Sequence, residues 1–306
     1  MATESPNPED GAFSFGCSKY PGGVPKGRGQ RPLMGHGLRC AAGFFRVRQK
    51  GRVSMAEYFK TSENRRIAYH KTEASGAETG APGIVFLGGF KSDMEGSKAL
   101  ALEAWARAQG RAFLRFDYSG HGVSDGAFTD GAIGDWYEDA RDLIMAVTSG
   151  PQVLVGSSMG GWISLLICRE HPEKVAGLVT IAAAPDFTED GYWAAFDAPT
   201  RRKLEEEGQI EVPSEYGEPY IITRRLINEG RNRLVLRSPL DLPFPVRFLQ
   251  GTADDAVSVE TANRLLDHVT GEDIQLTLVK GADHRFSTPD CLVMIERSVA
   301  EVLART

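Results

Sequence analysis

A serine between two spaced glycines is the first feature of this 306-residue chain that suggests chemistry. The segment VLVGSSMGGW holds Gly156, Ser158 and Gly160 in a G-x-S-x-G pattern, after an apolar run and before a helix-like stretch. A strand that turns sharply into a helix leaves no room for side chains two residues before and after the serine. Because such a turn exposes the hydroxyl, the pattern predicts that Ser158 is a nucleophile.

The neighbouring serine does not fit the same pattern. If Ser157 were the nucleophile, Val155 and Met159 would occupy the two positions that must be small. The alternative interpretation of the segment is a turn rich in glycine and serine that does no chemistry. The apolar strand before it and the helix after it favour the catalytic interpretation.

A serine hydroxyl needs a general base, and the base needs an acid that orients it. Where a serine follows a strand in this way, the acid and then the histidine come later in the chain. His284 lies in GADHRFST directly after a strand, where a loop can present it to the site, so we expect it to be the base. His268 lies in the helix-like ETANRLLDHV and is expected at the surface. His171 ends the helix after the serine and is expected to point away.

Two adjacent aspartates follow the strand before this histidine, in FLQGTADDAV. Asp254 keeps the G-x-x-D-x-x-V spacing from Gly251 to Val257, so we expect it to be the acid. Asp255 stays open as the alternative, and whichever residue is not the acid would be a carboxylate at a helix N-terminus. Asp283 is expected to fix the loop that carries the histidine.

The oxyanion of an acyl-transfer reaction needs hydrogen-bond donors. We expect one to be the backbone N–H of Met159, directly after the nucleophile, and the other to be that of Phe90 in FLGGF, after an earlier strand. A plain glycine turn is the alternative for FLGGF. His121, in FDYSGHGVSDG, precedes the serine, so we expect it to brace the neighbouring loops rather than act as the base.

Strand-like and helix-like segments alternate along the chain and would position these residues. This alternation predicts an α/β fold with a mostly parallel sheet and helices on both faces. The expected strands are 56–60, 66–72, 83–89, 111–118, 152–158, 175–184, 245–251 and 274–280, and the expected helices include 95–109, 133–149 and 159–170.

The alternation is interrupted at about 186–240, a long polar stretch with several aromatic residues. A loop of that length without structure is uncommon in a compact domain, so we expect a small helical lid insertion. Its apolar pieces, such as WAAF and EPYIITRRLI, either cover an acyl chain or pack on the core.

The first 55 residues differ in composition from the domain expected over 56–306. Residues 11–55 carry nine Lys or Arg and no acid, so 1–55 have a net charge of +6 and 56–306 of −12. A basic leader rich in Gly and Pro buries too little apolar surface to order itself, so we expect disorder. Three interpretations remain open: an organelle transit peptide, a nucleic-acid tail, or an artefact with Met55 as the true start, which composition favours.

The whole composition narrows the function classes. The net charge of −6 argues against a nucleic-acid partner, and no apolar run is long enough to span a membrane. The four cysteines have no metal-ligand spacing, which is typical of free thiols in a reducing compartment. The chemistry expected of Ser158 needs no metal and no cofactor.

GSSMGGW and RFDYSGHGVSDG, with the order Ser, Asp, His, resemble the α/β-hydrolase superfamily across residues 56–306. FLGGFKSDMEGSKALALEAWA and GADHRFSTPD resemble its palmitoyl-protein thioesterase branch, also described as mycophenolic acid acyl-glucuronide esterases. The resemblance implies an α/β-hydrolase fold and carries the roles of nucleophile, acid and base to Ser158, Asp254 and His284.

The resemblance also implies hydrolysis of acyl thioesters or activated esters, with S-acylated proteins among the substrates. A general carboxylesterase or acyl-glucuronide esterase is the alternative enzyme, and a serine peptidase lacks its usual accessory domain here. A non-catalytic binding module is the alternative outside enzymes, although such a module has no reason to keep all three residues. We expect a cytoplasmic protein, with a mitochondrial location as the alternative because the animal members of the branch are mitochondrial.

Overall fold

The computed structural model describes residues 55–78, 80–214 and 218–306. The leader expected to be disordered lies outside the described residues, apart from Met55.

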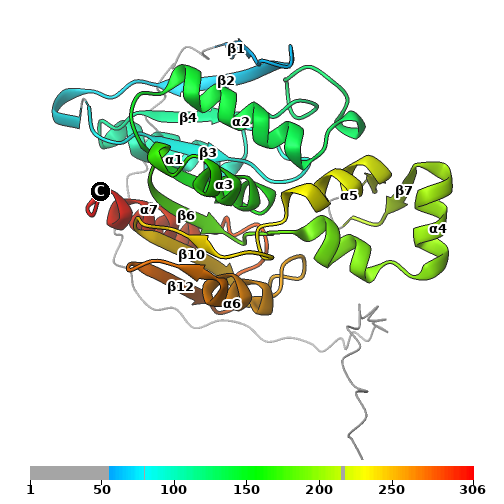
Figure 1. Ribbon diagram of the computed structural model, residues 1–306. Coiled ribbons are helices and arrows are strands. Elements are labelled where there is room, and N and C mark those ends of the chain that lie inside the picture. The colour runs from blue at the N-terminus through cyan, green and yellow to red at the C-terminus, as the bar shows by residue number, and fades with distance from the viewer. Residues whose placement is uncertain (1–54, 79, 215–217) are drawn as a thin grey trace, which may run out of the picture. The chain divides into compact units, whose positions relative to one another are not determined.

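A mostly parallel sheet forms the centre of the described domain (Figure 1). Among the described residues it has eight strands, in the order β1-β2-β4-β3-β5-β6-β10-β12. β1 and β2 run antiparallel to their neighbours in this sheet. The other six strands, β4, β3, β5, β6, β10 and β12, run parallel to one another. The strands are β1 (Glu57–Lys60), β2 (Arg66–Thr72), β3 (Ile84–Leu87), β4 (Phe113–Phe116), β5 (Gln152–Ser157), β6 (Val175–Ile181), β10 (Val246–Gly251) and β12 (Ile274–Val279). The sheet confirms the α/β prediction.

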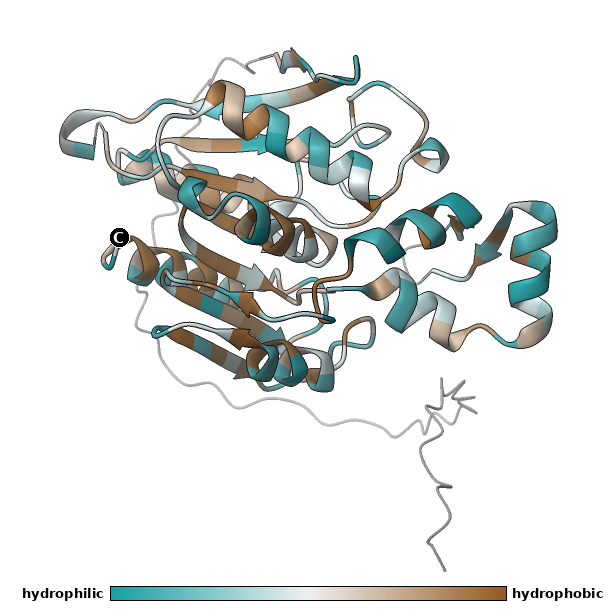
Figure 2. Ribbon diagram, in the orientation of Figure 1, coloured by the Kyte–Doolittle hydropathy of each residue, from teal (hydrophilic) through white to brown (hydrophobic). Residues whose placement is uncertain are grey.

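Helices cover both faces of this sheet, as an α/β alternation requires. Apolar residues of α2, α3 and α6 belong to the core on one face, and those of α1 and α7 to the core on the other. Figure 2 shows that the central strands and α3 are strongly hydrophobic. This composition fits their burial, since other elements cover them on all sides. The helices are α1 (Ser97–Ala108), α2 (Ile133–Val147), α3 (Met159–Glu170), α6 (Val259–His268) and α7 (Pro289–Leu303).

An insertion separates β6 from β10 and extends beyond the carboxyl end of β6 (Figure 1). Its helices α4 (Ala198–Glu207) and α5 (Arg224–Gly230) begin at side-chain caps, since Asp197 and Thr223 accept hydrogen bonds from backbone N–H groups of α4 and α5. It also contains an antiparallel hairpin, β7 with β8, which the sequence analysis did not predict. Its elements are a π-helix (Phe187–Trp193), α4 (Ala198–Glu207), β7 (Gln209–Val212), β8 (Tyr220–Thr223), α5 (Arg224–Gly230) and β9 (Leu240–Asp241), which pairs with β11 (Val269–Thr270).

A buried carboxylate ties the two ends of the insertion together. Asp186, at its start, accepts hydrogen bonds from the N–H groups of Val235 (2.8 Å) and Leu236 (3.0 Å) at its end. Arg237 lies 3.2 Å from the same carboxylate. Burial of the side chain raises the pKa of Asp186, and the two N–H donors and Arg237 oppose that effect.

We expect Asp186→Ala to lower the free energy of unfolding by about 2–4 kcal/mol, because two buried N–H groups would lose their acceptor. Chemical denaturation followed by circular dichroism measures the loss. Asp190→Ala is the matched control: Asp190 also pairs with Arg237, but near the surface, and should cost about 1 kcal/mol or less. Equal losses in the two variants would contradict the special role of Asp186.

Candidate active site

Ser158 lies on the sharp turn between β5 and α3. Its backbone has φ 54° and ψ −117°, a conformation that costs a non-glycine residue roughly 1–3 kcal/mol. Hydrogen bonds hold the turn: Ser158 N–H donates to the Ile181 carbonyl (2.9 Å), and Gly161 N–H donates to the Ser158 carbonyl (2.9 Å). Ser157, the rival serine, is the buried last residue of β5.

The glycines on either side of Ser158 lie where no side chain fits. A Cβ atom on Gly156 would lie 2.4 Å from the Gly160 carbonyl oxygen. A Cβ atom on Gly160 would lie 2.1 Å from the carbonyl oxygen of Leu87, at the end of β3. Both distances are far below contact, so the turn needs glycine at both positions.

Three side chains that follow β5, β10 and β12 meet at the carboxyl edge of the sheet. His284 Nε2 lies 3.1 Å from Ser158 Oγ. On the other side of the ring, His284 Nδ1 lies 2.9 Å and 3.0 Å from the two carboxylate oxygens of Asp254. These distances allow hydrogen bonds along the whole series, in the order that proton transfer from the hydroxyl requires.

The Asp254 carboxylate is fully buried and is held by three further donors. The N–H groups of Ala256 (3.0 Å) and Val257 (2.8 Å) donate to one oxygen, and Gln250 Nε2 (3.0 Å) donates to the other. Gln250 was not predicted as a site residue. A polar side chain near the end of an apolar strand was the one signal in the sequence that pointed to it.

The alternative carboxylates lie elsewhere. Asp255 is exposed to solvent. Asp283 accepts a hydrogen bond from Phe286 N–H (3.0 Å), within the loop that it was expected to fix. Asp254 is therefore the aspartate that the fold brings to His284.

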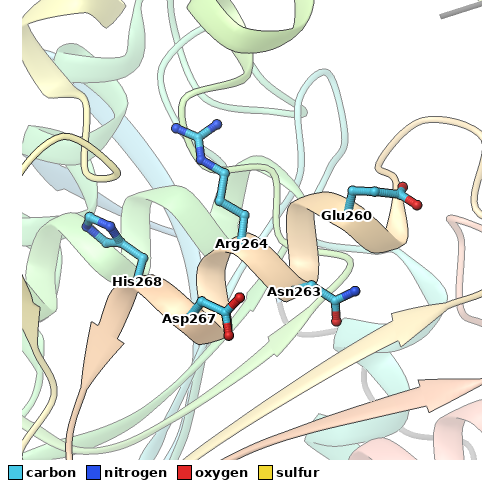
Figure 3. Close-up of a pocket in the computed structure, with 5 residues that line it drawn as sticks. All are labelled: Glu260, Asn263, Arg264, Asp267 and His268. Atoms are coloured by element: carbon cyan, nitrogen blue, oxygen red, sulfur yellow. The ribbon is translucent and has the colours of Figure 1, made fainter. Parts of the chain in front are cut away.

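His268, the alternative base, lies away from Ser158, at the last residue of α6. It lines an open hollow with Glu260, Asn263, Arg264 and Asp267, and this hollow includes none of the three residues that meet at Ser158 (Figure 3). His268 lies at the surface of the described domain, as expected, but it is not fully exposed. The ring is half-buried, because Nε2 hydrogen-bonds to the carbonyls of Val235 (3.0 Å) and Ser238 (2.8 Å) at the end of the insertion.

Two backbone segments that were expected to supply oxyanion donors lie next to Ser158. Met159 is the first residue of α3, and the first N–H groups of a helix have no partner inside it. In the loop after β3, a Cβ atom on Gly89 would lie 3.4 Å from Ser158 Cβ, so this loop passes directly beside Ser158. Phe90 is the next residue of that loop.

Aromatic side chains hold Phe90 in place. Its ring makes edge-to-face contacts with Phe128 (4.8 Å between centroids), Tyr220 (5.5 Å) and Phe187 (5.6 Å). The last two belong to the insertion, and they pack against the core as partly buried residues. This packing favours the interpretation that the apolar pieces of the insertion pack on the core rather than cover an acyl chain.

His121 braces the loop after β3, which carries Phe90, as expected. Its Nε2 accepts a hydrogen bond from Lys91 N–H (3.2 Å), so its Nδ1 carries the proton that is donated to the Ser119 carbonyl (3.2 Å). Burial lowers the pKa of His121 to about 4, so the ring stays neutral at physiological pH.

Within the described part of the chain, no group of three or more His, Cys, Asp or Glu residues could hold a metal ion. None of the helices described there is both long and apolar enough to cross a membrane.

The chain is similar to curated hydrolases in sequence. The family model described as "Serine aminopeptidase, S33" matches residues 83–207. The mouse protein "Palmitoyl-protein thioesterase ABHD10, mitochondrial" is 36% identical over 240 residues, which cover 78% of each chain. The human protein of the same name is 37% identical over 221 residues, covering 72% of this chain and 70% of its own.

Solved structures are similar as well. The structure of mouse ABHD10 matches with a TM-score of 0.75 and 32% identity, covering 82% of this chain and 99% of its own. A crystal structure from Agrobacterium vitis matches with a TM-score of 0.77 and 38% identity, covering 81% of this chain and 98% of its own. The ferulic acid complex of Est1E from Butyrivibrio proteoclasticus, at 17% identity and a TM-score of 0.69, supports the fold alone; it covers 81% of this chain and 100% of its own.

The contacts of the two aspartates predict different effects of the same substitution. We expect Asp254→Asn to lower kcat for a p-nitrophenyl ester by on the order of 10³–10⁴, because an amide no longer stabilises the protonated imidazole. Asp255→Asn should change kcat by less than about twofold, since its side chain is exposed. A large loss with Asp255→Asn and a small one with Asp254→Asn would contradict this assignment of the acid.

Proposed function

The chain belongs to the α/β-hydrolase family of the palmitoyl-protein thioesterase ABHD10, and on that premise we propose that it cleaves acyl thioesters through an acyl-enzyme on Ser158. S-acyl cysteine in proteins is the preferred substrate class in this proposal. The single observation that carries it is the 3.1 Å distance between His284 Nε2 and Ser158 Oγ, with Asp254 bound to the opposite side of the ring.

In the proposed first step, His284 takes the hydroxyl proton while Ser158 attacks the acyl carbon. Asp254 keeps the imidazole in the tautomer whose Nε2 is free to accept that proton, and stabilises the imidazolium that forms. The protonated His284 then gives the proton to the leaving thiol. In the second step, His284 activates a water molecule that releases the acid and restores the hydroxyl.

The negative charge that develops on the acyl oxygen needs donors that are already in place. We assign this role to the N–H groups of Met159 and Phe90. The strained turn at Ser158 orients the first donor, and the aromatic contacts of the Phe90 ring orient the second. Both donors are backbone groups, so their position depends on packing rather than on side-chain rotamers.

The names of the relatives support the thioester substrate and a mitochondrial location. The mouse and human relatives are named as mitochondrial palmitoyl-protein thioesterases. The expectation of a cytoplasmic protein has no such support, so we propose the mitochondrial alternative. The described geometry suits any activated acyl group, which makes acyl glucuronides and simple esters the competing substrates in a test.

We expect Ser158→Ala to abolish hydrolysis, because the hydroxyl is the atom that becomes acylated. The measurement is kcat/KM for a panel of S-acyl peptides, acyl-CoA, p-nitrophenyl esters and acyl glucuronides. S-acyl peptides should be the best substrates, by about tenfold or more. A fluorophosphonate probe should label the wild type and leave Ser158→Ala unlabelled.

Two results would count against the proposal. A correctly folded wild type that neither reacts with the probe nor cleaves any member of the panel would favour a non-catalytic binding module. A clear preference for glucuronides or simple esters would keep the hydrolase and reject the thioesterase assignment.

A further inference from the structure

A lysine outside the catalytic residues reaches the loop that carries the proposed base. Lys98 lies in the first turn of α1, and its Nζ donates a hydrogen bond of 2.5 Å to the Arg285 carbonyl. Arg285 directly follows His284, so the bond ends one peptide away from the imidazole. It joins residues that are 187 positions apart in the chain.

The loop that receives this bond is strained and tightly held. Phe286 is fully buried and adopts φ 49°, a left-handed conformation that a bulky residue takes only when its surroundings enforce it. Its N–H is bound by both the side chain and the carbonyl of Asp283. Lys98 binds the carbonyl and Asp283 binds the N–H of the same peptide, the one between Arg285 and Phe286, so this peptide is fixed at both ends. It begins one residue after His284, so its position limits the direction of the imidazole.

Three charged groups from two loops surround the Lys98 ammonium. Asp283 attracts it and Arg285 repels it, both from the loop of His284, and Asp254 attracts it from the loop after β10. Lys98 is half-buried, and this burial is the main reason that its pKa falls, to about 8. The ammonium is therefore charged at neutral pH and loses its proton in mildly alkaline solution.

We propose that Lys98 is a positioning residue for His284, and that its positive charge is needed to hold the imidazole between Asp254 and Ser158. This inference rests on the proposed function of Ser158 and His284. A charged donor makes a hydrogen bond roughly twice as strong as a neutral one, so a neutral amine would hold the Arg285 carbonyl less firmly. The neutral form would also lose its attraction to Asp283 and Asp254.

The test is the dependence of kcat on pH, from about pH 6 to 10, for a p-nitrophenyl ester that is hydrolysed through Ser158. In the wild type, Lys98 is charged below its pKa and neutral above it, so kcat should fall as the pH rises through about 8. In Lys98→Arg the guanidinium stays charged, so this fall should disappear while kcat at neutral pH stays within about threefold. In Lys98→Met, kcat should be about tenfold lower at neutral pH, with KM nearly unchanged and no fall near pH 8.

Lys280 is the matched control, since it is an exposed lysine four residues before His284. Lys280→Arg and Lys280→Met should keep the pH profile of the wild type. If Lys98→Met fails to fold by circular dichroism, Lys98→Arg still decides the question through its profile. A fall near pH 8 that persists in Lys98→Arg, or full activity of Lys98→Met at neutral pH, would overturn the inference.

The result separates this inference from the proposed function. If the wild type hydrolyses nothing and reacts with no fluorophosphonate, the assignment of Ser158 fails and the inference fails with it. If the wild type is active but the Lys98 variants share its pH profile, the catalytic assignment stands and the role of Lys98 is rejected.

Discussion

The hydrogen bond between the imidazole of His284 and the hydroxyl of Ser158 joins residues 126 positions apart, and the sheet makes it possible. Because β5, β6, β10 and β12 run parallel, the loops that follow them all emerge at one edge. Asp254 reaches the same place from the loop after β10. A sheet with β5, β10 or β12 reversed would carry the same residues and could not bring them together.

Backbone strain is concentrated at this edge. Among the described non-glycine residues with positive φ, Lys91, Ser158, Ala182 and Phe286 lie in the loops that follow β3, β5, β6 and β12. Each such conformation costs roughly 1–3 kcal/mol and persists only where neighbouring contacts enforce it. Those contacts include the bond from Ala182 N–H to the Leu249 carbonyl and the bond from Lys91 N–H to His121. The sheet and these contacts thus fix the loops that carry Phe90, Ser158 and His284 in conformations that the loops would not keep without them.

The insertion is physically connected to the catalytic edge. The ring of Phe90 contacts Phe187 and Tyr220 of the insertion, while its own backbone N–H is the proposed oxyanion donor. The two ends of the insertion are joined to each other through Asp186. A continuous series of contacts thus runs from the insertion through the Phe90 ring to the loop beside Ser158.

The sequence alone determined the α/β fold, the turn at Ser158 and the choice of His284, because apolar periodicity, glycine spacing and chain order are local signals. It could favour Asp254 over Asp255 by spacing, but only the fold shows which carboxylate is buried beside the imidazole. The hairpin of β7 and β8 escaped prediction, since its short strands pair within a long polar stretch. The contact of Lys98 with the loop of His284 was equally invisible. A hydrogen bond across 187 residues depends on how α1 packs against α7 and the loop that precedes it, and that packing is a property of the tertiary structure.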